Sequence, residues 1–170
     1  MTAKAIWSKF VMRLITDAAG AVTRYGYDAR GNLIAAEDAT RAITRYQIDT
    51  HGQVTRITDA LGKRRVISYN AAGQITAYTD CSDETTRYRY RSDLPQSPLA
   101  AITDSLGHAT DYEHDRMARL TAVHQPDGGQ QSFSYDTSRK SGVSRLDHYS
   151  FCMKALLHKG IVQELMKVDF

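Results

Sequence analysis

The segment Thr23-Arg24-Tyr25-Gly26-Tyr27-Asp28-Ala29-Arg30-Gly31-Asn32-Leu33 decides the fold of this chain. In its first part Thr23 and both tyrosines alternate with other residues, so they share one face of an expected strand. Threonine and tyrosine are favourable strand residues because their side chains pack well on a pleated surface. Asp28 and Gly31 then mark a tight turn, since aspartate bonds its own backbone and glycine supplies a positive φ. The segment therefore predicts a strand, a turn and the beginning of a second strand.

The same pattern returns every 21 residues, in units that open at Asp17, Asp38, Asp59 and Asp80. The next opening, Asp104, comes three residues late, and the slot 21 residues after it holds Gln125. A mostly aromatic pair follows each opening, at Tyr25/Tyr27, Tyr46/Ile48, Ile67/Tyr69, Tyr88/Tyr90, Tyr112/His114 and Phe133/Tyr135. A fixed period of this length indicates a repeat protein whose unit is one β-hairpin and one turn.

The second half of each unit carries an apolar pair whose members are three residues apart. These pairs are Met12/Ile15, Leu33/Ala36, Val54/Ile57, Ile75/Tyr78, Leu99/Ile102 and Leu120/Val123. A regular strand places same-face residues two apart, so the spacing predicts a bulge or a bend around a curved wall. One hairpin alone is marginal in water, and stacked neighbours are expected to bury each other's tyrosine face.

The predicted fold is all-β, with tandem antiparallel β-hairpin repeats that form a curved strip of sheet. We expect an N-terminal lead-in over residues 1–9, a repeat region of six units over 10–137, and a non-repeat tail over 138–170. Apolar residues of the tail fall near helical spacing, although Gly160 weakens a helix. The tail is interpreted as a capping helix, as a frayed end, or as out-of-frame sequence joined to a repeat fragment.

Two segments, Tyr27-Asp28-Ala29-Arg30-Gly31-Asn32-Leu33 and Tyr135-Asp136, resemble the YD repeats of RHS proteins in this 21-residue setting. Similar repeats build the cocoon of insecticidal toxin complexes and the barrel of teneurins. The resemblance implies a strip of sheet that spirals into a hollow shell. In bacterial members, which are secreted or surface-delivered, the shell encloses a C-terminal toxin used in competition between bacteria. The D-P-x-G sequence after which such proteins cleave themselves is absent here, so we expect no self-cleavage.

The resemblance favours a structural scaffold whose partners are neighbouring repeats or the remainder of a larger RHS shell. The expected structural repeat residues are Tyr25, Tyr27, Asp28, Gly31, Tyr46, Gly52, Tyr69, Gly73, Tyr88, Tyr90, Tyr112 and Tyr135. The alternative is a module that binds cell-surface carbohydrate, because aromatic rings with polar ends suit contact with sugars. Tyrosines packed against a neighbouring hairpin favour the scaffold, whereas tyrosines that line an open groove favour binding.

Composition excludes several other functions. The net charge is only +3 with both signs interleaved, so no nucleic-acid partner is expected, and Lys63-Arg64-Arg65 is interpreted as a solvated strand face. The chain has no apolar run long enough to span a membrane, and residues 1–7 do not resemble a secretory signal.

The sequence contains no recognisable catalytic, cofactor or metal motif, and we expect no enzyme activity. Its six histidines form no HExxH pair, and the mixed cluster of His148, Cys152 and His158 would need a further metal ligand. The longer connection over 91–98, with its two prolines, is interpreted as a tolerated insertion in preference to a binding loop.

Overall fold

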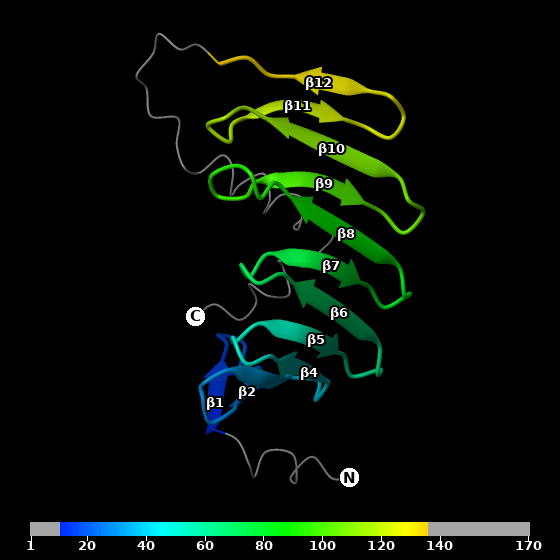
Figure 1. The fold of residues 1–170 in the computed structure, drawn as a ribbon. Helices are drawn as coiled ribbons and strands as arrows, with labels where there is room; N and C mark the ends of the chain where they lie inside the picture. Colours follow the sequence, from blue (N-terminus) through cyan, green and yellow to red (C-terminus); the bar gives the residue numbers. More distant parts are fainter. Residues whose placement is uncertain (1–10, 136–170) are drawn as a thin grey trace. The chain divides into compact units, whose positions relative to one another are not determined.

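The computed structural model describes residues 11–135, and this part of the chain is an antiparallel β-structure without helices. Its 12 strands follow one another in the sheet in the order of the sequence (Figure 1). The strands are β1 (Val11–Thr16), β2 (Val22–Tyr27), β3 (Leu33–Glu37), β4 (Ile43–Ile48), β5 (Val54–Thr58), β6 (Arg64–Tyr69), β7 (Ile75–Thr79), β8 (Thr85–Tyr90), β9 (Leu99–Thr103), β10 (Ala109–His114), β11 (Leu120–His124) and β12 (Gln130–Ser132). The predicted all-β hairpin fold is confirmed, whereas the lead-in and the helical interpretation of the tail lie outside the described residues.

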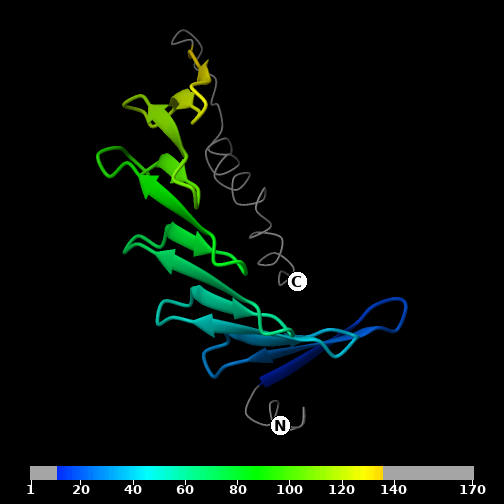
Figure 2. The same ribbon diagram turned by 90° about the vertical axis from the view of Figure 1, so that its right-hand side faces the viewer.

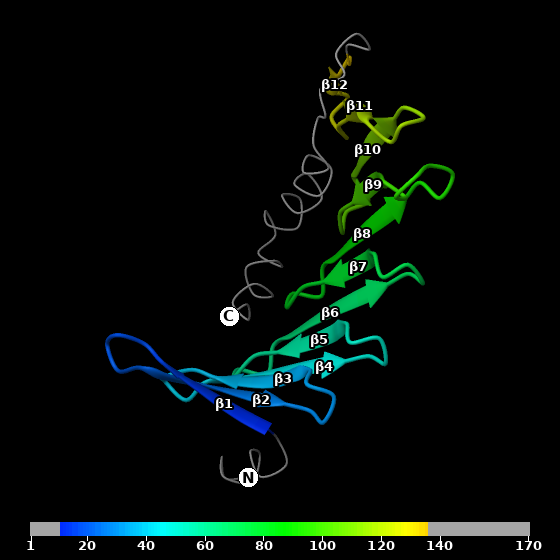
Figure 3. The ribbon, with the colours of Figure 1, turned by 90° about the vertical axis from the view of Figure 1, so that its left-hand side faces the viewer.

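The chain divides into two compact units, one up to Arg87 and one from Tyr88 onward. Within the first unit, each strand from β1 to β7 is hydrogen-bonded to the next strand in the sequence. Within the second unit, β9 to β12 are paired in the same way. The turns between successive strands therefore lie alternately at the two ends of the strands (Figures 2 and 3).

A β-bulge at the same place in the repeats explains the three-residue spacing of the apolar pairs. In the β2–β3 hairpin Tyr25 stands opposite Ala36 and Tyr27 stands opposite Leu33, so one extra residue, Ile34, is accommodated between the two pairs. Equivalent register shifts follow Gln47, Ser68 and Glu113. Because of the bulge, both apolar residues of the second strand lie on the same face as the tyrosine pair.

The tyrosine face holds most of the buried apolar side chains. In the first unit Ile67 on β6 stands opposite Tyr78 on β7, and both are buried, as is Ile57 on β5. In the second unit the buried residues include Leu99 and Val123. By contrast, the apolar residues of β1 are largely exposed. Within each of the two compact units the core is therefore a thin layer on one face of the strands, as expected for repeats that pack on their neighbours.

Candidate functional site

The turns between strands are stabilised by hydrogen bonds to the side chain of the aspartate or asparagine that begins each turn. Oδ1 of Asp28 accepts hydrogen bonds from the backbone N–H groups of Arg30 and Asn32, both at 2.9 Å, and the Gly31 N–H donates to the Asp28 carbonyl at 3.1 Å. The side-chain amide of Asn32 also donates to this carboxylate, and it is the first cause of a lowered pKa at Asp28. A backbone N–H two residues later donates to the side-chain oxygen in the same way at the first residue of other turns, including Asp17, Asp49, Asp59, Asn70, Asp104 and Asp115. These side chains are engaged by the backbone of their own turns.

The turn glycines adopt the left-handed conformation that the sequence pattern predicts. Gly31, Gly52 and Gly73 have φ values of 87°, 84° and 79°. The turns of successive repeats also meet, since the Gln53 side-chain amide donates to the Gly73 carbonyl at 3.2 Å. A side chain at this glycine would therefore be opposed both by the backbone conformation and by the adjacent turn.

Two tyrosines of the repeat join one hairpin to the hairpin before it. The Tyr69 hydroxyl on β6 donates to the Val54 carbonyl on β5 at 2.9 Å, and the Tyr135 hydroxyl donates to the Leu120 carbonyl at 2.7 Å. Val54 and Leu120 both lie at the bulge of the preceding hairpin, where the strand ladder is locally interrupted. The tyrosine hydroxyl thus supplies a donor to a carbonyl at this irregularity.

The remaining expected repeat residues are distributed along the array and are not gathered into one site. Tyr25, Tyr27, Tyr46, Tyr90 and Tyr112 are half-buried on their strands. Tyr88 is 7% exposed. The Arg13 guanidinium also lies over the Tyr27 ring, 5.8 Å from its centroid. Most of these rings are at least half covered, which favours scaffold packing over an open groove for sugars.

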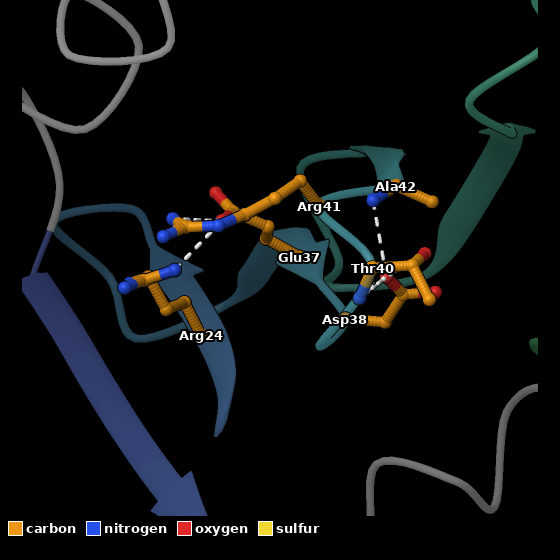
Figure 4. A network of polar contacts seen from close by, with 6 residues as sticks. All are labelled: Arg24, Glu37, Asp38, Thr40, Arg41 and Ala42. Atoms are coloured by element: carbon orange, nitrogen blue, oxygen red, sulfur yellow. Dashed lines mark hydrogen bonds and ion pairs between the residues drawn. The ribbon is translucent and has the colours of Figure 1, made fainter. Parts of the chain in front are cut away.

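Glu37 is a buried charged residue that the repeat pattern does not contain. Its side chain is 2% exposed, and its Oε1 accepts from Arg24 at 2.7 Å and from Arg41 at 2.9 Å (Figure 4). Most other units have threonine at the position of Glu37 and glycine at the position of Arg41. Arg41 nevertheless keeps the left-handed conformation of the glycine, with φ of 72°. Sequence reasoning did not identify this network, although the two departures from the repeat in one turn were a visible signal.

The longer connection between β8 and β9 is closed by its own contacts. Arg91 replaces the turn aspartate and forms two hydrogen bonds with Asp93, of 2.7 and 2.5 Å. This contact lowers the pKa of Asp93 to about 2. The Arg91 N–H donates to the Pro98 carbonyl at 2.8 Å, and Pro98 is fully buried. These contacts close the loop on itself, and its interpretation as a tolerated insertion stays a prediction.

Neither a metal site nor a membrane-spanning helix is found in residues 11–135. No three His, Cys, Asp or Glu side chains of this part come together as metal ligands. No helix of this part is long and apolar enough to cross a membrane. An open depression near Asp28, Asn32 and Asp49 is lined by turn residues already engaged in backbone bonds. His148, Cys152 and His158 lie outside the described residues.

Comparison with known proteins agrees with the repeat architecture. The RHS Repeat family matches residues 13–43 and 98–130. These two segments are therefore similar to RHS repeats. No protein with a curated description matches the sequence.

Solved structures of toxin complexes share the fold. A crystal structure of TcdB2-TccC3-Cdc42 is similar over 69% of this chain, with a TM-score of 0.59 and 23% identity. A crystal structure of TcdB2-TccC3 covers 62% of the chain with a TM-score of 0.52 and 25% identity, as does a variant of the Photorhabdus luminescens Tc holotoxin pore. The chain spans only 6%, 6% and 5% of the length of these three proteins.

Proposed function

We propose that this chain is a wall segment of an RHS-type shell that encloses a C-terminal toxin used in competition between bacteria. In this role it is a structural scaffold without catalysis, and its partners are the adjoining repeats of the shell. The observation that carries the proposal is the hydrogen bond from Tyr69 to Val54, repeated from Tyr135 to Leu120. At these two places a tyrosine of the repeat fixes one hairpin to the preceding one, as a continuous wall requires.

The similarity to toxin-complex structures supports this role, because the matched segment is a small part of much longer chains. An array whose strands pair with their neighbours in sequence can be extended by adding hairpins at either end. A wall of this kind needs no active site, and the turn carboxylates described above are already committed to backbone bonds.

The test is to isolate the protein from its native source with an antibody against residues 11–135 and to examine the particle. We expect electron microscopy to show a hollow particle, and limited proteolysis to leave an enclosed fragment intact until the particle is opened with denaturant. A protein that is digested completely outside the repeats, with no hollow particle, would contradict enclosure. The matched control is the same digestion of the isolated 170-residue chain, which encloses nothing if the shell is needed.

A further inference from the structure

The face of the first unit opposite the tyrosines carries a cluster of three arginines from three strands. Arg45 on β4 stands opposite Thr58 on β5, and Thr58 stands opposite Arg64 on β6. Arg56 lies two residues before Thr58 on the same face, so it is the diagonal neighbour of both Arg45 and Arg64. Diagonal neighbours in an antiparallel pair are about 7–8 Å apart, which is within reach of long side chains. The three guanidinium groups therefore arise from one small area of the sheet.

This positive charge is not neutralised by contacts within the described residues. The side chains of Arg45, Arg56 and Arg64 form no ion pair or hydrogen bond in this part of the chain. Glu37 is the acidic residue diagonal to Arg45 on this face, but its Oε1 is already bonded to Arg24 and Arg41. That network thus adds two arginines and only one carboxylate beside the cluster.

Arg56, at the centre of the cluster, has a donor without a partner among the described residues. Its Nε is buried, and no acceptor in the described part of the chain bonds to it. The residues opposite Arg56 are Gln47 on β4 and Val66 on β6. Buried donors in proteins are almost always paired, because an unpaired one loses its hydrogen bond to water without replacement. A bound anion is one source of the acceptor that this donor lacks.

We propose that Arg45, Arg56 and Arg64 form a binding site for a small soluble anion of phosphate type. Guanidinium groups bind such anions through paired, charge-assisted hydrogen bonds. A phosphate group combines a charge of about −1.5 to −2 with three acceptor oxygens, so one group can balance more than one arginine. A single carboxylate offers less charge and only two oxygens.

The site revises the interpretation of Lys63-Arg64-Arg65 as a solvated strand face. Because side chains alternate along β6, Arg64 joins the cluster, whereas Arg65 stands opposite Ile57 on the tyrosine face. The basic patch is therefore made by strands that are adjacent in space and not by the run in the sequence. This inference does not depend on the proposed shell function, since a wall segment can have the site or lack it.

The test is to titrate the full chain with inorganic phosphate at constant ionic strength while recording the arginine Nε–Hε signals by NMR. We expect a saturable shift of the Arg56 signal, which is assigned by its disappearance in Arg56→Lys, and no such shift with chloride. Arg45→Gln and Arg64→Gln should each weaken binding about tenfold, the effect of losing one charge-assisted contact. Arg56→Lys keeps the charge but lacks the Nε donor, and it should also bind more weakly.

The matched control is Arg87→Gln, which removes another exposed arginine from the same face. Arg87 stands opposite Ala77, away from the cluster, and its loss should leave phosphate affinity unchanged within about twofold. Thermal melts of each variant separate lost binding from lost folding, and Arg64→Lys provides a milder change if a glutamine variant does not fold. Absence of a saturable shift, or equal weakening by Arg87→Gln, would overturn the proposal. Binding to phosphatidylserine vesicles without a response to inorganic phosphate would overturn the assignment to a small soluble anion.

Discussion

The hydroxyl of Tyr69 donates a 2.9 Å hydrogen bond to the carbonyl oxygen of Val54, 15 residues earlier in the chain. Val54 lies at the bulge of the β4–β5 hairpin, while Tyr69 belongs to the strand that begins the next hairpin. The bond therefore links two repeats at the place where strand pairing is irregular. Tyr135 and Leu120 have the same 15-residue separation and the same bond. We infer that this contact is a recurring joint of the array.

Removal of this joint should lower stability. Tyr69→Phe leaves the ring in place but removes the donor to the Val54 carbonyl, so we expect the free energy of unfolding to fall by about 1 kcal/mol. Urea denaturation measures the change. Tyr25→Phe is the matched control, because Tyr25 occupies the same face of its strand and its hydroxyl forms no hydrogen bond within the described residues. Equal losses in the two variants would show that the Val54 contact is not responsible.

The same tyrosine should make stability fall at alkaline pH. Burial raises the pKa of Tyr69 above its usual value of 10.0, and the nearby charge of Asp49 raises it further. The folded state then holds the phenol proton more tightly than the unfolded state, so this stabilisation is present at neutral pH and is lost as pH rises above about 10. We expect the melting temperature to decline less steeply above this pH in Tyr69→Phe than in the unmodified chain. Identical pH profiles would contradict the contribution of Tyr69.

The turn glycines should not tolerate valine. Gly31→Val, Gly52→Val and Gly73→Val each force a β-branched residue into positive φ, which should cost about 1 kcal/mol or more. The largest loss is expected at Gly73, where an added Cβ would lie 3.1 Å from the Gln53 side-chain nitrogen. Thermal melts compare the three variants with Ala72→Val, which changes an exposed residue of the same turn. Unchanged midpoints in all three glycine variants would contradict the turn geometry.

The reverse substitution should stabilise a turn that lacks its glycine. Ala118 occupies the glycine position of the β10–β11 turn with φ of 60°. Ala118→Gly removes the strain of the side chain, although the unfolded chain gains freedom, so a net gain of about 0.5 kcal/mol is expected. Differential scanning calorimetry of this variant measures the gain. The same change at a position of negative φ, Ala29→Gly, serves as the control and should not stabilise the protein.

The sequence predicted those features that depend on local pattern. The alternation around Tyr25 and Tyr27 predicted strands, and the spacing of Asp28 and Gly31 predicted the turns. The spacing of Leu33 and Ala36 predicted the bulge, because a same-face pair three residues apart requires one extra residue. Each of these signals lies within one 21-residue unit, where neighbours in sequence are also neighbours in space.

Features that depend on strand register were not predicted. Arg45, Arg56 and Arg64 are far apart in the sequence, and only the pairing of three strands brings them together. The buried position of Glu37 was also missed, because a glutamate beside a turn is usually solvated. It is buried here because Arg24 on the adjacent strand and Arg41 in the turn both reach its carboxylate.

Glu37 and Arg41 should behave as a coupled pair. Glu37→Thr restores the residue found in most other units, but it leaves Arg24 without its buried partner and leaves Arg41 in a strained conformation. Arg41→Gly relieves that strain but removes one of the two cations that bond to the Glu37 carboxylate. We expect Glu37→Thr to lower the free energy of unfolding by about 2 kcal/mol, because it removes hydrogen bonds between charged groups while Arg24 and Arg41 stay partly exposed.

The double variant, Glu37→Thr with Arg41→Gly, recreates the threonine and glycine that the repeat has at Thr58 and Gly62. Its loss of stability should therefore be smaller than the sum of the two single losses, by about 1 kcal/mol for residues in direct contact. Urea denaturation of the four proteins in this cycle gives the coupling energy. The cycle is repeated in 1 M salt, where the partly exposed Arg41 contact is screened and the coupling should shrink. Additive losses at both salt concentrations would show that the two residues stabilise the turn independently, and that the ion pair in Figure 4 does not hold it.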